Sequence, residues 1–129
     1  MVFVDTSVWI AYFRGKNAAL GEHLDLLLGQ DEVALPVPVR VELLAGSSRN
    51  ERRQLRELML ALPAYYPEVS TWARMEAWTE LAVGAGQRFG LGDLLIAAIA
   101  ADHQGELWSL DSDFAAMARL QFLTLHASP

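Results

Sequence analysis

The N-terminal residues read Val2-Phe3-Val4-Asp5-Thr6-Ser7-Val8-Trp9-Ile10. The β-branched and aromatic residues at the start of this stretch predict a buried strand over residues 1–4. The three polar residues that follow favour a helix N-terminus, because their side-chain oxygens can accept hydrogen bonds from unpaired backbone N–H groups. A buried strand that passes through a carboxylate into a helix is typical of parallel α/β sheets.

Short apolar runs alternate with helical patterns along the rest of the chain. Further strands are predicted over residues 33–35, 107–110 and 122–125. Helices are predicted over residues 8–14, 20–28, 38–44, 50–62, 70–83, 93–102 and 112–120. Such alternation places helices on both faces of a parallel sheet. We therefore expect a three-layer α/β/α fold, with a short central parallel sheet of four or five strands and one domain over residues 1–129.

The composition excludes several classes of protein. The chain has 129 residues, of which 53% are hydrophobic and 20% charged, whereas disordered chains combine low hydrophobicity with high net charge. It has no cysteine, which excludes disulfides, cysteine zinc sites and thiol catalysis. With 10 Lys and Arg against 16 Asp and Glu, the net charge is −6. A polyanionic partner would therefore have to meet a local basic patch or bound cations.

The sequence also limits the location and the reaction class. No basic leader precedes the first apolar run, and charged residues interrupt every apolar run before it reaches the roughly 20 residues of a membrane-spanning helix. We expect a soluble, cytoplasmic protein with no membrane partner. No Gly-Lys-Ser/Thr phosphate loop occurs, and no Ser-His-acid order stands out. His23, His103 and His126 stand outside any motif, which favours structural or solvated roles.

Acidic residues follow the predicted strands and begin a predicted helix. Asp5 follows the first strand, Asp111 and Asp113 follow the third, and Asp93 begins an apolar helix after a glycine-rich turn. Because parallel strands end at one edge of a sheet, and ligand sites form there, these side chains are expected to converge. Glu42 lies within the apolar helix over residues 38–44, where a charge is rarely buried without a partner.

Each of these carboxylates has an ordinary explanation when it is taken alone. An Asp at a helix start is a common N-cap worth roughly 1 kcal/mol, and one Glu on a short helix is compatible with a solvated face. Together they would repel one another unless divalent cations neutralised them. Carboxylate oxygens suit Mg²⁺ or Mn²⁺ rather than zinc. One or two such ions would favour hydrolysis of phosphate esters by an activated water.

Four motifs, in order and correctly spaced, resemble those of the PIN-domain ribonucleases, specifically the VapC toxins of VapBC toxin–antitoxin pairs. The resemblance covers almost the whole chain. The first motif is the opening strand with its Asp-x-Ser turn. The other three are Val39-Arg40-Val41-Glu42-Leu43-Leu44-Ala45-Gly46, Gly92-Asp93-Leu94-Leu95-Ile96-Ala97-Ala98 and Leu107-Trp108-Ser109-Leu110-Asp111-Ser112-Asp113-Phe114. One departure is Leu94, since many members carry Ala directly after this Asp.

The resemblance implies a set of catalytic and metal-binding residues. The quartet would be Asp5, Glu42, Asp93 and Asp111. Asp113 would be a further ligand or would contact the ligands without binding the metal itself. Ser7 and Ser109 would orient carboxylates or water through hydrogen bonds of their hydroxyls.

The resemblance also implies an activity and partners. The chain would be a Mg²⁺- or Mn²⁺-dependent endoribonuclease that cleaves tRNA or ribosomal RNA. It would form a homodimer, be inhibited by a VapB-like antitoxin, and form a higher-order complex with that antitoxin. The alternative within the fold is a catalytically silent PIN-like module that binds RNA or protein. A dehalogenase-like phosphotransferase would need a second Asp at Ser7, and a response-regulator receiver would need a late lysine, whereas Lys16 is the only lysine.

A basic stripe lies within the helix predicted over residues 50–62 and just before it. Its members share helical spacing and are Arg49, Arg52, Arg53 and Arg56. A charge run of this kind is usually a solvated helix face. The alternatives are a grip on the RNA backbone beside the acidic site and a contact for the antitoxin.

Two helices carry more aromatic bulk than their length requires. Trp72, Met75 and Trp78 predict either core packing or a dimer contact. On the first helix, the corresponding residues are Trp9, Tyr12 and Phe13, which predict either ordinary core or the walls of a groove for an antitoxin helix. We expect such an antitoxin to insert an arginine among the carboxylates, because a guanidinium pairs with carboxylates bidentately.

Overall fold

The computed structural model describes residues 1–129, which form a five-stranded parallel sheet in the order β3-β2-β1-β4-β5. The strands are β1 (Val2–Val4), β2 (Val33–Pro36), β3 (Ala64–Tyr65), β4 (Glu106–Trp108) and β5 (Thr124–Leu125). The helices are α1 (Thr6–Arg14), α2 (Ala18–Gly29), α3 (Val37–Ala45), α4 (Arg49–Leu60), α5 (Val69–Gly84), α6 (Leu91–Asp102) and α7 (Ser112–Arg119). The expected α/β/α fold is confirmed.

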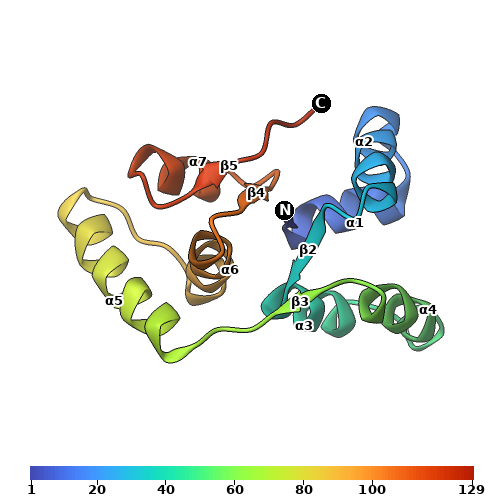
Figure 1. The fold of residues 1–129 in the computed structure, drawn as a ribbon, viewed down its shortest axis with the longest axis horizontal. Coiled ribbons are helices and arrows are strands. Elements are labelled where there is room, and N and C mark those ends of the chain that lie inside the picture. Colours follow the sequence, from blue (N-terminus) through green and yellow to red (C-terminus); the bar gives the residue numbers. More distant parts are fainter.

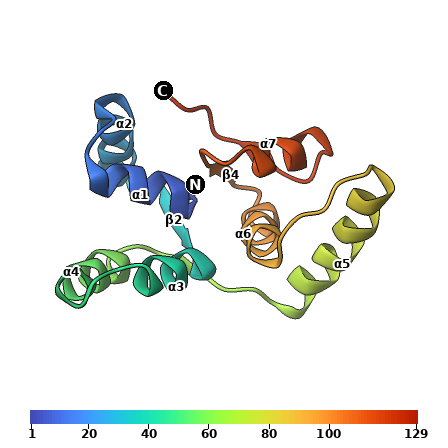
Figure 2. The ribbon, with the colours of Figure 1, turned by 180° about the vertical axis from the view of Figure 1, so that it is seen from behind.

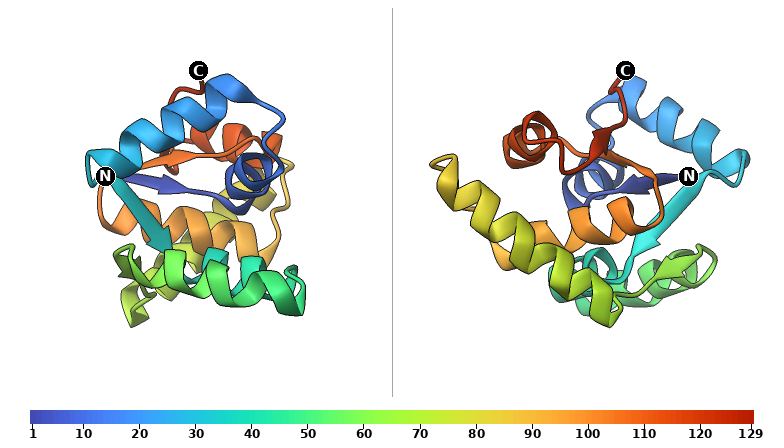
Figure 3. Two further views of the ribbon diagram at one scale, coloured as in Figure 1. Left: turned by 90° about the vertical axis from the view of Figure 1, so that its right-hand side faces the viewer. Right: turned by 60° about the vertical axis from the view of Figure 1, so that its left-hand side comes forward.

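The helices cover both faces of the sheet (Figure 1). In the left view of Figure 3, α2 lies above the strands, and α6, α3 and α4 lie below them. Figure 2 shows α5 packed beside α6 at the outer end of the molecule. Because every strand runs in the same direction, the loops that leave the strand C-termini gather at one edge of the sheet.

The first strand occupies the centre of the sheet. Val2 pairs with Val33 of β2 on one side and with Glu106 of β4 on the other. All three residues of β1 are buried, as a strand covered on both faces must be. The Phe3 ring packs so closely against Gly105, just before β4, that a Cβ atom at Gly105 would lie 2.5 Å from the ring's Cδ2.

Several boundaries differ by one or two residues from those expected, and three differences concern the sheet edge or the acidic residues. Residues 64–65 form the edge strand β3, although the prolines around them favour a loop; this pairing with β2 involves only two residues. The predicted strand over residues 107–110 ends at Trp108, so Ser109 and Leu110 belong to the loop at the strand C-terminus. Helix α6 begins at Leu91 rather than at Asp93.

The C-terminal tail is attached to the sheet and to α2. The backbone N–H of His126 donates to the Leu107 carbonyl at 2.8 Å. Its side-chain nitrogens lie 2.9 Å from Glu106 Oε1 and 2.8 Å from His23 Nε2. The indole N–H of Trp108 donates to the hydroxyl of Ser128 at 2.7 Å. Two of the three histidines therefore have structural roles.

None of the helices combines the length and the apolar character needed to cross a membrane.

Candidate metal centre

A buried carboxylate, Asp5, lies where β1 ends and α1 begins. Its Oδ2 accepts hydrogen bonds from the hydroxyls of Ser7, at 2.7 Å, and Ser109, at 2.8 Å. The Ser7 hydroxyl also accepts from the backbone N–H of Leu110 at 3.0 Å, and the Ser109 hydroxyl accepts from that of Asp111 at 3.0 Å. All of the bonds to this carboxylate end on Oδ2, which leaves Oδ1 available to a ligand.

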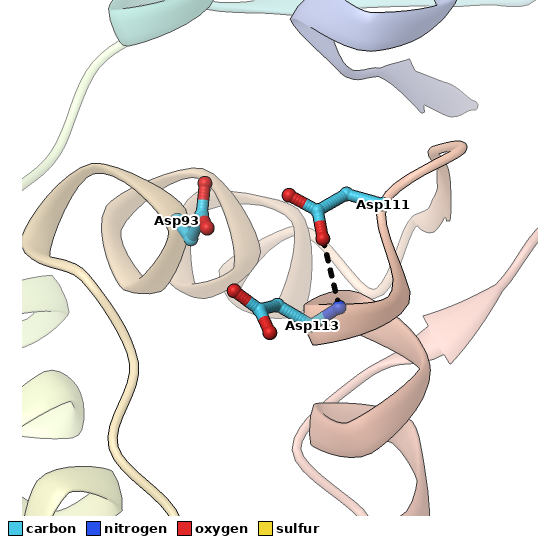
Figure 4. A group of neighbouring side chains, drawn as sticks. All are labelled: Asp93, Asp111 and Asp113. Atoms are coloured by element: carbon cyan, nitrogen blue, oxygen red, sulfur yellow. Dashed lines mark hydrogen bonds between the residues drawn. The ribbon is translucent and has the colours of Figure 1, made fainter.

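Three further carboxylates meet at the same edge of the sheet. Asp93 projects from the first turn of α6, and Asp111 and Asp113 project from the start of α7 toward it (Figure 4). One oxygen from each of the three lies within 4.8 Å of the others. Asp111 Oδ1 accepts a bond from the backbone N–H of Asp113 at 2.9 Å, which orients the pair. The structure therefore places Asp113 among the candidate ligands.

Helix capping explains the presence of some of these aspartates and not of others. Asp5 and Asp111 do cap α1 and α7, since the side chain of each accepts a backbone N–H two residues later. Asp93 does not cap α6, because Gly90 occupies that position and makes no side-chain bond. Helix formation therefore accounts for the first two carboxylates and leaves Asp93 without a structural reason to be acidic.

The pKa of Asp93 shows the electrostatic cost of the cluster. Burial and, after it, the negative charges of Asp111, Asp5, Asp113 and Glu42 raise its pKa from 3.8 to about 6. An acid that titrates this high is held in an environment that disfavours its own charge. A cation between these side chains would reverse that effect.

Glu42 joins the cluster from α3, with a different environment. Its side chain is exposed at the surface. Its pKa is raised by partial burial of the carboxyl group and by the charge of Asp5, and is lowered by the hydroxyl of Thr6. Glu42 therefore lies close enough to Asp5 to be affected by its charge.

The donor set fits a hard divalent cation. All five acidic side chains offer carboxylate oxygens, and neither a histidine nor a sulfur atom is among them. Mg²⁺ and Mn²⁺ prefer such oxygen ligands, whereas zinc prefers nitrogen and sulfur. The residues that could hold the ion are Asp5, Glu42, Asp93, Asp111 and Asp113.

A groove of about 750 Å³ lies between α1, α3 and α4, and Glu42 is the residue of the acidic cluster that lines it. Glu42 lies in its wall, together with Ile10 and Phe13 of α1 and Leu55 and Leu58 of α4. Of the two alternatives for the aromatic residues of the first helix, Phe13 lines this groove and Trp9 belongs to the core, where it is fully buried. Tyr12 does not line the groove, and its hydroxyl donates to Asp25.

The basic stripe lies on α4. Its four arginines, Arg49, Arg52, Arg53 and Arg56, are all exposed. Arg52 donates to the Ser47 carbonyl, and Arg53 forms an exposed ion pair with Glu57 at 3.8 Å. Since exposed pairs of this kind contribute little to stability, the stripe remains available to a partner.

The aromatic helix α5 is mainly a core element. Met75 and Trp78 are buried, and Trp78 stacks in parallel on Phe122 with ring centroids 4.6 Å apart. Trp72 alone of the three keeps much of its surface in solvent, at 43% exposure.

Comparison with known proteins agrees with this geometry. The family model described as "PIN domain" matches residues 2–120. The chain is 30% identical over 125 residues to VapC ribonuclease Mb1587 of Mycobacterium bovis and to ribonuclease VapC11 of Mycobacterium tuberculosis, covering 93% of each chain. It belongs to the PIN-domain family and, within it, to the VapC proteins. The resemblance drawn from the four motifs is confirmed.

Solved structures show the same PIN fold in toxin–antitoxin complexes. VapBC2 of Rickettsia felis, bound to a DNA fragment of its promoter, matches with a TM-score of 0.80 at 19% identity, covering 98% of each chain. VapBC-1 of nontypeable Haemophilus influenzae matches with a TM-score of 0.79 at 21% identity, covering 98% of this chain and 97% of the other. At these identities the likeness establishes the fold.

One residue at the centre of this PIN domain escaped the sequence patterns. Thr6 lies between Asp5 and Ser7, and its hydroxyl lowers the pKa of Glu42, which belongs to the neighbouring helix α3. The only signal was its place within the Asp-Thr-Ser turn, where each of the three residues can serve as a helix cap. Contact between residues on different helices depends on the fold.

Substitution of Asp93 tests the electrostatics of the cluster. Because the folded state holds this proton up to about pH 6 and the unfolded state releases it near pH 4, Asp93 makes the unfolding free energy fall as pH rises between these values. Asp93→Asn should remove that fall. It should raise metal-free stability at pH 7 by about 1–2 kcal/mol, after a discount for solvent screening.

The measurement is urea unfolding at pH 4, 5, 6 and 7 in the presence of a chelator. The matched control is Glu22→Gln, which removes one exposed carboxylate of α2, away from the cluster. Equal pH slopes for Asp93→Asn and the wild type would show that Asp93 is not destabilised by its neighbours.

Proposed function

We propose that this VapC protein is a Mg²⁺- or Mn²⁺-dependent endoribonuclease that acts as the toxin of a toxin–antitoxin pair. The observation that carries the proposal is the convergence of Asp93, Asp111 and Asp113, with oxygens within 4.8 Å, beside the buried Asp5. Helix capping accounts for Asp5 and Asp111, but no structural need accounts for Asp93 and Asp113 so close to them. The curated relatives are named ribonucleases, which gives the reaction class.

The chain's own residues position the reaction. Asp5 is held by two serine hydroxyls, so its free oxygen faces the site in one orientation. Asp93 must lose its proton before it can act as a ligand, which couples binding of a cation to release of a proton. Glu42 reaches the site from the groove and could accept a proton from the attacking water. A bound divalent ion would supply Lewis acidity at the scissile phosphate and lower the pKa of that water.

The test is cleavage of RNA by purified protein. Asp93→Asn should lower Mn²⁺-dependent cleavage by more than roughly 100-fold, because removal of a metal ligand reduces activity more than removal of a residue that only hydrogen-bonds to a ligand. Since Asp93 does not cap α6, the variant keeps its fold, which the unfolding data above would check. Glu22→Gln should cleave as the wild type does.

Undiminished cleavage by Asp93→Asn would contradict its assignment as a ligand. Wild-type protein that binds RNA and cleaves none with Mg²⁺ or Mn²⁺ would instead identify a catalytically silent PIN-like module.

The basic stripe is proposed to grip the RNA backbone. Arg52→Glu with Arg56→Glu, made in the Asp93→Asn background so that RNA stays intact, should weaken RNA binding. The plot of log K for RNA binding against log salt concentration should also become less steep. Loss of two phosphate contacts would reduce the magnitude of its slope by about 1.4. Arg119→Glu on α7 is the control for charge reversal alone. A slope that does not change would assign the stripe to solvent or to the antitoxin.

The groove between α1, α3 and α4 is proposed to hold a helix of a VapB-like antitoxin. Its apolar residues would contact the helix, and Glu42 at its wall leads to the carboxylates. A peptide that carries an arginine at the inner end should inhibit cleavage, because the guanidinium would compete with the cation for the same oxygens.

The same peptide with Arg→Ala should bind the groove and fail to inhibit. Competition assays that measure both binding and cleavage separate these effects. Equal inhibition by the two peptides would mean that the antitoxin acts by covering the site.

Further features of the proposal follow from the family. Residues 1–129 would act as one PIN domain in the cytoplasm, with tRNA or ribosomal RNA as substrate. The chain would form a homodimer, with a higher-order complex when the antitoxin is bound. The structures of VapBC complexes that share the fold support a VapB partner.

A further inference from the structure

Two histidines lie head to head where the C-terminal tail meets α2 (Figure 3). The Nε2 atoms of His23, on α2, and His126, in the tail, are 2.8 Å apart. The two ring planes differ by 20°, and the ring centroids are 5.1 Å apart. Because the centroids are much farther apart than the facing nitrogens, the rings meet edge to edge. Both Nε2 atoms therefore point to the same place between the helix and the tail.

A carboxylate holds the other nitrogen of the His126 ring. Nδ1 of His126 lies 2.9 Å from Oε1 of Glu106, at the start of β4. A carboxylate accepts hydrogen bonds, so it favours the tautomer of a neutral His126 that carries its proton on Nδ1. The lone pair of His126 Nε2 then faces His23, whose Nε2–H donates to it. Histidines that bind metals commonly have such an acceptor behind the ring, because it fixes the tautomer and the ring orientation.

The surroundings of the histidine pair are apolar on one side and open to solvent on another. The buried ring of Trp108 packs against both imidazoles, with centroids 5.1 Å from that of His23 and 5.7 Å from that of His126. The side chain of His126 is 16% exposed and that of Glu106 is 49% exposed. A small ion can therefore reach the pair from solvent, while Trp108 keeps the rings in place.

We propose that His23 and His126 form a second cation site, for Zn²⁺ and similar divalent ions that prefer imidazole nitrogen, with Glu106 as the group that orients His126. This site differs in chemistry from the acidic centre, whose oxygen ligands suit Mg²⁺ or Mn²⁺. The inference does not depend on the proposed ribonuclease activity.

The geometry of the pair needs only a small adjustment to hold such an ion. Two Zn–N bonds of about 2.0–2.1 Å at a tetrahedral angle place the nitrogens roughly 3.3 Å apart. The observed 2.8 Å would have to open by about half an ångström, which rotation of the two side chains can supply. The proton between the rings would move to Nδ1 of His23, so that both Nε2 lone pairs face the ion, and water would complete the coordination. The ion would then join α2 to the tail beside β4.

The experiment measures Zn²⁺ binding by calorimetry and by thermal unfolding, in a large excess of Mg²⁺ that occupies the acidic centre. An ion that binds only the folded protein raises the unfolding midpoint. We expect Zn²⁺ to bind more than roughly tenfold more weakly to His23→Gln and to His126→Gln, and up to roughly tenfold more weakly to Glu106→Gln, which keeps an acceptor oxygen. His103→Gln removes the third histidine, which follows α6, and should bind Zn²⁺ as the wild type does.

Equal Zn²⁺ affinity in the wild type and in the double variant His23→Gln/His126→Gln would overturn the inference, and the pair would then be a hydrogen bond only. If the histidine variants do not fold, NMR of the wild type in excess Mg²⁺ decides. Zn²⁺ should shift the imidazole signals of His23 and His126 and leave those of His103 in place. Signals of the pair that do not move, or that move no more than those of His103, would contradict the site.

Discussion

A single carboxylate oxygen, Oδ2 of Asp5, joins the two halves of the site. It accepts the hydroxyl of Ser7 from the start of α1 and that of Ser109 from the loop after β4. Each serine in turn accepts a backbone N–H from the loop that carries Asp111. A buried charge is costly unless hydrogen bonds or an opposite charge compensate it. That requirement connects the β1–α1 junction to a loop more than a hundred residues later, and it orients Asp5 and the backbone before Asp111.

The acidic edge is maintained against its own repulsion. Partial burial and, after it, the charges of four other carboxylates raise the pKa of Asp93 to about 6. Three helices begin at or near this edge, and the partial positive charge of their N-termini offsets part of the repulsion. A protein selected for stability alone would replace one of these side chains. A bound cation would explain why all of these carboxylates are present, because it would neutralise the repulsion that destabilises the metal-free protein.

Sequence patterns predicted the features that depend on residues close together in the chain. They missed the features that depend on contacts between distant segments. The apolar runs around Asp5 and Asp111 predicted the central strands and the shared edge, because parallel strands bury both faces. The two-residue strand β3 has too little sequence to show a period, and it exists through its pairing with β2. Asp93 resembled an N-cap, but α6 begins two residues earlier because a glycine serves as the cap. The relation of Thr6 to Glu42 arises only from the packing of α1 on α3.

The position of β1 has a consequence for the order in which the molecule can form. Of the five strands, β1 is synthesised first, and it lies in the middle of the sheet, where its Val2 pairs with Glu106 of β4. Contacts of such high sequence separation form late, because the loop between them must close first. Asp5 therefore meets Ser109 only after β4 and the loop that follows it have been synthesised. A nascent chain on the ribosome, surrounded by RNA, would lack an assembled centre until the segment that carries Asp111 and Asp113 has emerged.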